Sequence, residues 1–158
     1  MTKLIKAKIE DKELLSNLVE IYLGELNEFE NKVKDKNGKF GYKYLDLYWE
    51  ETNRHPFLIK VGDELAGFIL INLDDPESNE KNIHTIAEFF IIKKFRNKGV
   101  GKESARMIFE MFPGKWVVRQ LAENKIGQLF WQKIISDYSN GKFKEETEEK
   151  GPILKFSN

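Results

Sequence analysis

An almost unbroken apolar segment, Thr85–Ile92, is the feature of this 158-residue sequence that most restricts its fold. A strand with one side in water alternates polar and apolar residues, whereas a run without that alternation is typical of a strand covered on both faces. We therefore expect this segment to lie centrally in a sheet with helices on both sides. With 41% hydrophobic residues, the chain can build a sizeable core, and its length suits a single domain, residues 1–158.

The spacing of apolar residues predicts the elements around the central strand. Two β-rich runs flank Gly62-Asp63-Glu64, a pattern typical of an antiparallel hairpin. The order β, α, α, β, β, β, α, β, α, β, β indicates a mixed α/β fold. The other predicted strands are Leu4–Ile9, Phe57–Val61, Leu65–Ile71, Trp116–Leu121, Lys142–Thr147 and Pro152–Phe156. Four helices are predicted. The first is capped by Asp11 and buries Leu14, Leu15, Leu18, Ile21, Tyr22 and Leu26, and the second is the short aromatic stretch Tyr44–Trp49. The third buries Ala105, Ile108, Phe109 and Phe112, and the fourth is capped by Asn124 and buries Ile126, Leu129, Phe130 and Ile134.

Composition excludes several classes of function. The 26 Lys and Arg balance the 26 Asp and Glu, so no overall charge attracts the chain to nucleic acid or anionic membranes. Without cysteine, and with two histidines, the chain has no thiol nucleophile, disulfide or three-histidine metal site. No apolar stretch reaches the roughly 20 residues that span a bilayer, and the first residues lack a signal peptide's apolar run. We expect a cytoplasmic protein without a metal, membrane or nucleic-acid partner.

A charged, glycine-containing segment, Arg96–Gly101, follows the central strand and leads into a helix. The first turn of a helix leaves backbone N–H groups free, and the helix dipole favours an anion there. Gly99 and Gly101 would let a diphosphate approach the backbone, while Arg96 and Lys98 would add mobile positive charge. The same residues are equally compatible with a plain tight turn.

Two other phosphate-binding patterns do not fit this segment. A Walker loop requires Ser or Thr after Gly101-Lys102, where the chain has Glu103. A dinucleotide-binding turn has a third glycine, which Ser104 replaces, and it follows the first strand of its sheet. The context of the segment therefore has to decide its function.

A second motif, Asn124-x-x-Gly127-x-x-Phe130-Trp131, leads into the last predicted helix. The hairpin, the central strand, the Arg-x-x-Gly-x-Gly turn at Arg96–Gly101 and this Asn-led helix, in that order, resemble the GNAT superfamily of acetyl-CoA-dependent N-acyltransferases. The resemblance covers nearly the whole chain. It implies a central mixed, mostly antiparallel sheet that is splayed in a V and flanked by about four helices.

The resemblance also implies acetyl-CoA as the cofactor. Its pyrophosphate would lie on the N–H groups of the turn, and its pantetheine arm would lie in the V against the backbone of the preceding strand. Asn124 would lie near that arm, although it equally suits a plain helix N-cap. The cofactor-binding residues expected on this basis are Phe90, Ile91, Ile92, Arg96, Asn97, Lys98, Gly99, Val100, Gly101, Lys102, Asn124, Phe130 and Trp131.

Acyl transfer to an amine requires a base, and Glu88 is the best candidate. It is the only ionisable residue between Ile86 and Ile92, and loss of hydration there would raise its pKa toward neutrality. Many members of the resembling family carry an acidic residue at the start of this strand. The alternative is a carboxylate at a wet edge, or one paired with a lysine such as Lys93.

The position of the acid departs from the family pattern. The family commonly places a tyrosine seven residues after the asparagine, where this chain has Trp131, and an indole cannot protonate a leaving thiolate. Trp131 would pack against the cofactor arm, line the acceptor pocket or belong to the core. Tyr138 is a substitute candidate for the acid.

In the resembling family the acceptor site is shaped by the first two helices and the closing strands. Tyr44, Tyr48 and Trp49 are therefore candidates to bind the substrate together with Glu88, or to be core. His55 and His84 are interpreted as turn residues, His84 being a reserve base. The expected activity is acetyl transfer to the primary amine of a small molecule or peptide, and a non-catalytic acyl-CoA-binding module is the alternative. The closing edge strands could pair in a homodimer.

Overall fold

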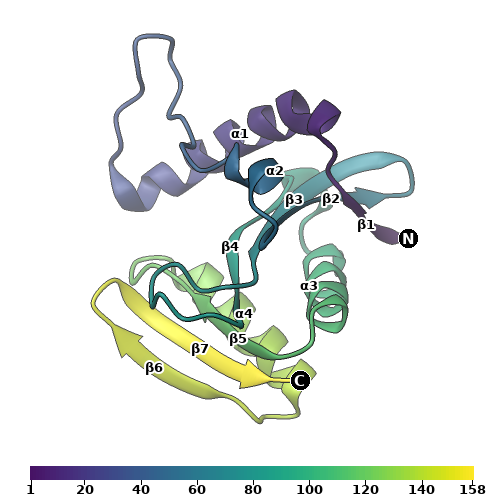
Figure 1. Cartoon of the computed structure of the whole chain (residues 1–158), viewed down its shortest axis with the longest axis vertical. Coiled ribbons are helices and arrows are strands. Elements are labelled where there is room, and N and C mark those ends of the chain that lie inside the picture. Colours follow the sequence, from purple (N-terminus) through teal and green to yellow (C-terminus); the bar gives the residue numbers. More distant parts are fainter.

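The computed structural model describes the whole chain, residues 1–158, and contains one seven-stranded sheet in the order β1-β2-β3-β4-β5-β7-β6 (Figure 1). Only β4 and β5 run parallel, and all other neighbours are antiparallel. The prediction of a central strand in a mixed, mostly antiparallel sheet is confirmed. The strands are β1 (Thr2–Lys6), β2 (Arg54–Val61), β3 (Glu64–Asn72), β4 (Ile83–Ile91), β5 (Lys115–Arg119), β6 (Lys144–Glu148) and β7 (Gly151–Ser157).

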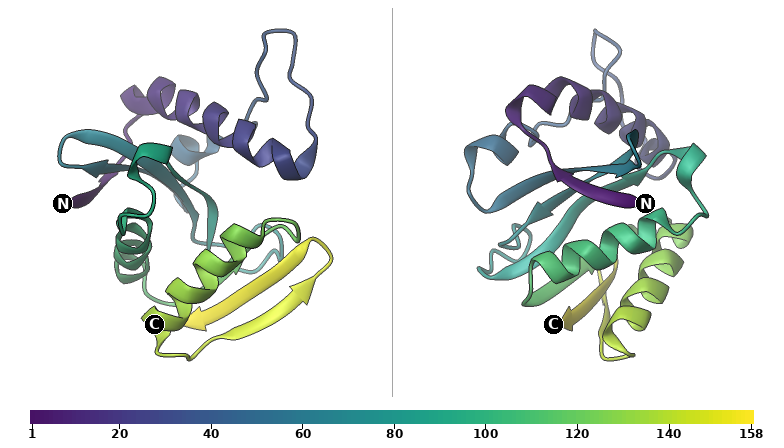
Figure 2. Two further views of the ribbon diagram at one scale, coloured as in Figure 1. Left: turned by 180° about the vertical axis from the view of Figure 1, so that it is seen from behind. Right: turned by 90° about the vertical axis from the view of Figure 1, so that its right-hand side faces the viewer.

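Four α-helices cover the two faces of the sheet, and the predicted order of elements is confirmed. Figure 2 shows α1 across one face, with α3 and α4 on the other. Each face has its own buried cluster, one built with α1 and one built with α3 and α4. None of the helices combines the length and apolar composition needed to cross a bilayer. The helices are α1 (Lys12–Glu30), α2 (Leu47–Glu50), α3 (Val100–Met111) and α4 (Lys125–Ser139), and 3₁₀ turns span Ile9–Asp11 and Lys93–Phe95.

The buried face of α4 differs from the prediction. Ile126 and Leu129 are 84% and 67% exposed, and the residues buried on α4 are Trp131, Ile134 and Ile135. Both sets have helical spacing, so periodicity alone could not choose between them. The choice is tertiary, because α4 packs against β7 and α3 along its second set.

The first strand and the face of α1 also differ in part. The strand ends at Lys6, and the carboxylate of Asp11 accepts a hydrogen bond from the Lys8 amide at 2.9 Å, so it caps the 3₁₀ turn and not α1. Leu14 and Ile21 are exposed. The helix buries Leu15, Leu18, Val19 and Leu23 against the sheet.

A β-bulge in β4 decides which side chains face which layer. The register with β3 shifts between Leu70↔Glu88 and Ile71↔Ile86, which leaves Ala87 as the extra residue. In a regular strand Ile86 and Glu88 would share a face. Here Ile86 joins the cluster under α3 and α4, whereas the Glu88 carboxylate meets Tyr22 of α1.

The outer edge of the sheet is highly charged. All five residues of β6 are exposed, and four of them, Lys144, Glu145, Glu146 and Glu148, carry charge. Charged side chains on an edge strand oppose pairing with a second sheet. This feature gives no support to the predicted pairing of closing strands in a homodimer.

Candidate active site

The sheet divides between β4 and β5. The two strands pair over only three positions, Ile83↔Lys115, His84↔Trp116 and Thr85↔Val117. Beyond them β4 continues to Ile91 with no strand on this side, while β5 pairs onward with β7. The divergence is the splayed arrangement that was predicted. It leaves one side of β4, from Ile86 to Ile91, without a backbone partner.

At the end of β4 the chain forms a turn whose amides are free. Asn97 and Gly99 have φ values of 60° and 80°, in the left-handed region. The first backbone bond of α3 runs from the Glu103 amide to the Gly99 carbonyl at 3.0 Å, and the amides of residues 97–102 donate to no protein group. Successive free N–H groups at a helix N-terminus form an anion-binding concavity. We call residues 97–102 the amide turn.

Glycine is required at two positions of the amide turn for different reasons. Gly99 has a left-handed backbone, and a β-carbon there would point into open space. At Gly101 a β-carbon would lie 3.0 Å from two ring atoms of Phe130, so the close packing of α4 on this turn depends on the missing side chain. The first glycine keeps the concavity open, and the second lets α4 approach it.

Arg96 does not supply the mobile charge that was predicted for it. Its Nε donates to the Ile91 carbonyl at 2.8 Å, one terminal nitrogen bonds to Glu25 of α1 at 2.8 Å, and the guanidinium lies over the Phe90 ring. Arg96 therefore connects β4, the amide turn and α1. Lys98 is exposed, without an acidic partner, and it is the cation free to meet an anion at this turn.

Backbone direction alternates along the end of β4. The Ile92 amide donates to the Ala66 carbonyl on the β3 side at 2.7 Å. By the alternation of antiparallel ladders, Phe90 also pairs with β3, whereas Phe89 and Ile91 direct their backbone groups toward the split. Of the predicted pantetheine contacts, Ile91 faces the split and Phe90 and Ile92 do not. Phe89 was missed, although strand parity could have identified it.

The motif at the start of α4 is structural. The Asn124 side chain accepts a hydrogen bond from the Gly127 amide at 2.9 Å and donates to Gln120 at 3.3 Å, so both ends of its amide are engaged as an N-cap. A β-carbon on Gly127 would lie 2.5 Å from the Gln120 side-chain oxygen. The spacing of Asn and Gly thus serves the helix start, next to the split.

The two aromatic residues that follow have separate positions. Phe130 lies over Gly101, with its ring centroid 5.6 Å from that of Phe89, and so lines the split. Trp131 is 3% exposed and packs edge-on against Phe89 and Phe130. It offers almost no surface to a ligand, and of its alternative roles the structure gives it that of a core residue.

Glu88 lies on the opposite face of β4, between α1 and the segment before α2. Tyr22 donates to one carboxylate oxygen at 2.8 Å and Tyr42 to the other at 3.4 Å. Burial raises the pKa of Glu88 from 4.5 to about 7, against the opposing effect of the two tyrosine hydrogen bonds. Burial and the charge of Glu88 in turn raise the pKa of both tyrosines, which keeps them protonated as donors. Glu88 is the kind of carboxylate that can exchange a proton near neutral pH.

The aromatic residues predicted to bind the acceptor are dispersed. Tyr44 is exposed, whereas Tyr48 is buried and its hydroxyl donates to the Asn72 side chain at 2.9 Å. The indole N–H of Trp49 donates to the Ala7 carbonyl at 3.1 Å. Tyr48 and the partly buried Trp49 therefore attach α2 to its neighbours, as the core alternative required, and only Tyr44 is exposed.

Tyr138 and His84 do not reach the split. The Tyr138 hydroxyl accepts a hydrogen bond from Asn158 at 2.8 Å, and its ring packs on Phe109. The Tyr138 ring also packs on Phe156, which pairs with Trp116 where β4 and β5 are still joined, so Tyr138 lies at the closed end of the split. Both ring nitrogens of His84 lie within 3.1 Å of backbone carbonyls, which makes it a structural residue.

Tyr22 and Tyr42 are the residues at Glu88 that sequence reasoning missed as functional. Tyr22 was expected on the apolar side of the first helix, and its hydroxyl was the available signal that this position differs from a leucine. Tyr42 lies in an irregular loop, and no local pattern indicates that it meets a residue 46 positions later.

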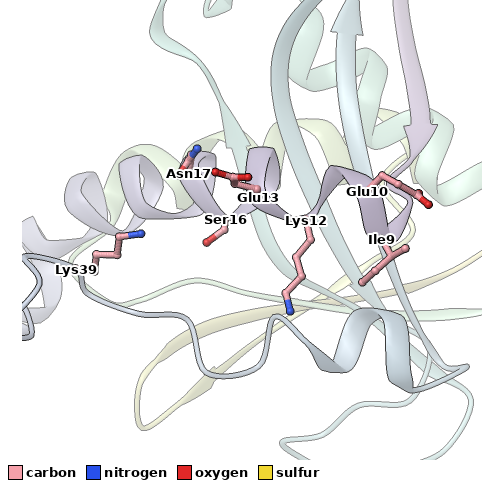
Figure 3. Close-up of a pocket in the computed structure, with 7 residues that line it drawn as sticks. All are labelled: Ile9, Glu10, Lys12, Glu13, Ser16, Asn17 and Lys39. Atoms are coloured by element: carbon pink, nitrogen blue, oxygen red, sulfur yellow. The ribbon is translucent and has the colours of Figure 1, made fainter.

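A hollow of about 480 Å³ lies elsewhere, between the start of α1 and the chain that returns toward α2 (Figure 3). One of its lysines, Lys12, forms an ion pair with Asp46. None of the candidate site residues at the split, the amide turn or Glu88 lines this hollow, and its surface is mostly polar and open to solvent. The lining residues are Ile9, Glu10, Lys12, Glu13, Ser16, Asn17 and Lys39.

The same fold occurs in solved acetyltransferase structures. An acetyltransferase from Thermus thermophilus matches 100% of this chain and 96% of its own, with 15% identity and a TM-score of 0.72. The PaiA N-acetyltransferase from Thermoplasma acidophilum, solved with coenzyme A, matches 100% and 99%, with 15% identity and a TM-score of 0.65. The aminoglycoside acetyltransferase AAC(6')-Ib, also solved with coenzyme A, matches 100% and 95%, with 14% identity and a TM-score of 0.70. Identities this low show a shared fold.

Sequence comparison adds the family. No curated protein matches the chain. The sequence model described as the acetyltransferase (GNAT) family matches residues 17–134, from α1 through the buried part of α4. That match includes both tyrosines at Glu88, the split and the amide turn. Because it spans well over half of the sequence, this chain belongs to the acetyltransferase (GNAT) family.

Proposed function

We propose that the protein transfers an acetyl group from acetyl-CoA to the primary amine of a small molecule or peptide, by direct attack in a ternary complex with Glu88 as the base. The observation that carries the proposal is the Glu88 carboxylate, whose pKa of about 7 suits proton exchange near neutral pH. It lies on β4, the strand that leads into the amide turn.

Acetyl-CoA is the cofactor, consistent with the family and with the coenzyme A in two of the similar structures. The chain fits this group, because the amides of residues 97–102 have no protein partner. These amides and Lys98 would hold the pyrophosphate, and the backbone of Phe89 and the amide of Ile91, whose carbonyl bonds to Arg96, would hold the pantetheine. When bound, acetyl-CoA supplies the thioester carbonyl that the amine attacks.

The proton balance follows from the side chains present. An incoming ammonium must lose one proton before it is nucleophilic, and the Glu88 carboxylate accepts it directly or through water. The nitrogen loses a second proton as the C–S bond breaks and the amide forms, and that proton passes to the departing thiolate or to solvent. Tyr22 and Tyr42 keep the carboxylate oriented and are too weakly acidic to give up their own protons. The burial of Trp131 and the hydrogen bond between Tyr138 and Asn158 support transfer without either side chain acting as an acid. A thiol pKa near 8.5 makes the thiolate a tolerable leaving group without one.

The test is acetyl transfer to a panel of primary amines, followed through release of free thiol. We expect kcat/KM to rise with pH and then level off, with the midpoint of the rise near pH 7, where Glu88 ionises. Glu88→Gln should lower kcat at least tenfold and leave the Kd for coenzyme A nearly unchanged. Glu28→Gln, on the exposed side of α1, is the matched control. If Glu88→Gln retains full turnover, the carboxylate is not the base.

The second candidate is a non-catalytic module that binds acyl-CoA. The burial of Trp131 at the position where the family commonly has its tyrosine favours it. Binding of acetyl-CoA with no thiol release from any amine would support the module. Failure of acetyl-CoA to bind or to raise the melting temperature at millimolar concentration would contradict both candidates.

A further inference from the structure

The segment that brings Tyr42 to Glu88 is long and irregular. Residues 31–46, here called the α1–α2 loop, run outward from the end of α1 and return to it (Figure 1). Loops of this length without regular structure are uncommon in compact domains and are often functional. The loop tip is stabilised from within, since the Asp35 carboxylate accepts from the amides of Asn37 and Lys39 at 2.8 and 3.0 Å. Those bonds shape the tip but attach it to nothing else.

The backbone hydrogen bonds from the returning arm to α1 all go to one carboxylate, and the Lys12–Asp46 ion pair and the buried Leu45 add contacts nearer α2. Glu20 accepts the Phe40 amide on one oxygen at 2.8 Å and the Gly41 amide on the other at 2.9 Å. Two backbone donors on one ionised carboxylate form a strong, directional contact. The Phe40 ring also packs beside Gly24, where a β-carbon would lie 3.8 Å from it.

This attachment lies next to the residue that matters for Glu88. Gly41, whose φ is 73°, is followed directly by Tyr42. On the helix, Glu20 lies two residues before Tyr22, the other donor to Glu88. One turn of α1 therefore carries both Tyr22, which donates to Glu88 directly, and Glu20, which binds the backbone just before Tyr42.

We propose that Glu20 is a positioning residue, which holds the α1–α2 loop against α1 so that the Tyr42 hydroxyl reaches the Glu88 carboxylate. The catalytic consequence rests on the proposed function, whereas the contact itself does not. Glu20 acts through the loop backbone and does not touch Glu88.

The side chains that act on the charge of Glu88 come from three segments: Tyr22 and Glu30 from α1, Tyr42 and Lys32 from the loop, and Tyr48 of α2, whose own pKa Glu88 raises. Burial is the largest cause that raises the pKa of Glu88, and the hydrogen bond from Tyr42 lowers it. Release of the returning arm removes that hydrogen bond and also lets water reach the carboxylate, and these two changes oppose each other. The role of Glu20 is therefore tested by asking whether Tyr42 still acts on Glu88, and not by the sign of the shift that Glu20→Ala causes.

The experiment is a carbon-13 NMR titration of the Glu88 side-chain carboxyl in the full chain. In the wild type, Tyr42→Phe removes a donor without opening the site, and we expect it to raise the titration midpoint by up to about half a unit. In the Glu20→Ala background the same substitution should cause no further shift, because Tyr42 no longer reaches Glu88. In the background of Glu28→Ala, which removes an exposed carboxylate from the same helix, Tyr42→Phe should shift the midpoint as it does in the wild type. A full shift by Tyr42→Phe in the Glu20→Ala background would overturn the proposal.

A second measurement reports the loop itself. Trypsin should cut Glu20→Ala in the α1–α2 loop at least several-fold faster than the wild type or Glu28→Ala, with circular dichroism showing that each variant is folded. Glu20→Gln keeps one acceptor oxygen and should fall between them. Cleavage at the wild-type rate in Glu20→Ala would contradict the role of Glu20. Five lysines make the loop cleavable: Lys32, Lys34, Lys36, Lys39 and Lys43.

Both measurements are independent of acetyl transfer, so this inference can fail while the proposed function holds, and the reverse. Where turnover is measured, Glu20→Ala should lower kcat several-fold. The KM for acetyl-CoA should stay unchanged, because the amide turn is not altered. A general loss of structure would change all of these together.

Discussion

The cofactor side and the acceptor side of the candidate site are built from different chemical groups, backbone amides on one and side chains on the other. On the cofactor side, six consecutive residues present backbone amides, and their geometry depends on two glycines and a helix start. On the acceptor side, Glu88 of β4 meets side chains from α1 and from the α1–α2 loop, which are distant from it in sequence. A contiguous backbone site tolerates most side-chain changes, whereas a site of converging side chains depends on the packing of three segments. Substitutions should therefore separate the two sides cleanly.

The largest effect should come from the acceptor side as a change in stability. Burial raises the pKa of Glu88 from 4.5 to about 7, so the folded state binds the proton more tightly than the unfolded state. Stability is then lost as pH rises from about 4.5 through 7. Glu88→Gln removes this loss, and its advantage in unfolding free energy over the wild type should grow by about 2 kcal/mol between pH 5 and pH 8.

Urea unfolding at the two pH values measures this difference. Glu28→Gln, which removes an exposed carboxylate, should run parallel to the wild type. If Glu88→Gln also runs parallel, the carboxylate is hydrated in the folded protein and the acceptor side is more open than described here.

A smaller effect should separate backbone strain from anion binding on the cofactor side. Gly99 and Gly141 have φ values of 80° and 78°, and a β-carbon at either position meets nothing within 4 Å. Alanine at each should cost about 1 kcal/mol of stability. Only Gly99→Ala should also weaken coenzyme A binding, by about tenfold, because the backbone strain falls on the amide turn itself.

Calorimetry with coenzyme A and urea unfolding of both variants provide the comparison. Equal losses of affinity in the two variants would show that strain transmitted through the fold, and not the amide turn, controls binding. The pH midpoint of Glu88 should be the same in both, since neither position touches the acceptor side.

The smallest effect should rank the two tyrosines. Tyr22 lies 2.8 Å from Glu88 and Tyr42 lies 3.4 Å from it, so Tyr22→Phe removes the stronger donor. We expect Tyr22→Phe to raise the pH midpoint of kcat/KM by about half a unit, and further than Tyr42→Phe does. The affinity for coenzyme A should not change. The reverse order would mean that the acceptor binds with the loop closer to Glu88 than it is in the free protein.

The same contrast explains what the sequence could predict. The order of elements, the central strand and the amide turn follow from local patterns of apolar residues, glycines and a helix start, which the chain carries contiguously. The candidate base, Glu88, stood out as the one ionisable residue in an apolar run. Its partners did not stand out, because Tyr42 is brought to Glu88 by an irregular loop whose path is fixed by Glu20.

Two further errors have a common physical origin. The apolar residues of α4 fit two helical faces, and packing against β7 and α3 selected the one with Trp131. Likewise, the backbone groups that face the split depend on strand parity, which determined that Ile91 faces it and Ile92 does not. In both cases the pattern was present in the sequence but its phase was set by neighbouring elements.

The irregularity at Ala87 sets a condition for any attempt to graft this catalytic strand onto another scaffold. Glu88 shares a layer with the tyrosines while Ile86 occupies the opposite one, and this division exists because the ladder gains a residue between them. In a transplanted strand without the bulge, Ile86 and Glu88 would share one face. Either the carboxylate would then be buried among the apolar side chains under α3 and α4, or the isoleucine would lie in the layer of the tyrosines. The portable unit is therefore the strand with its extra residue, and an acidic side chain copied by position alone would arrive on the wrong side.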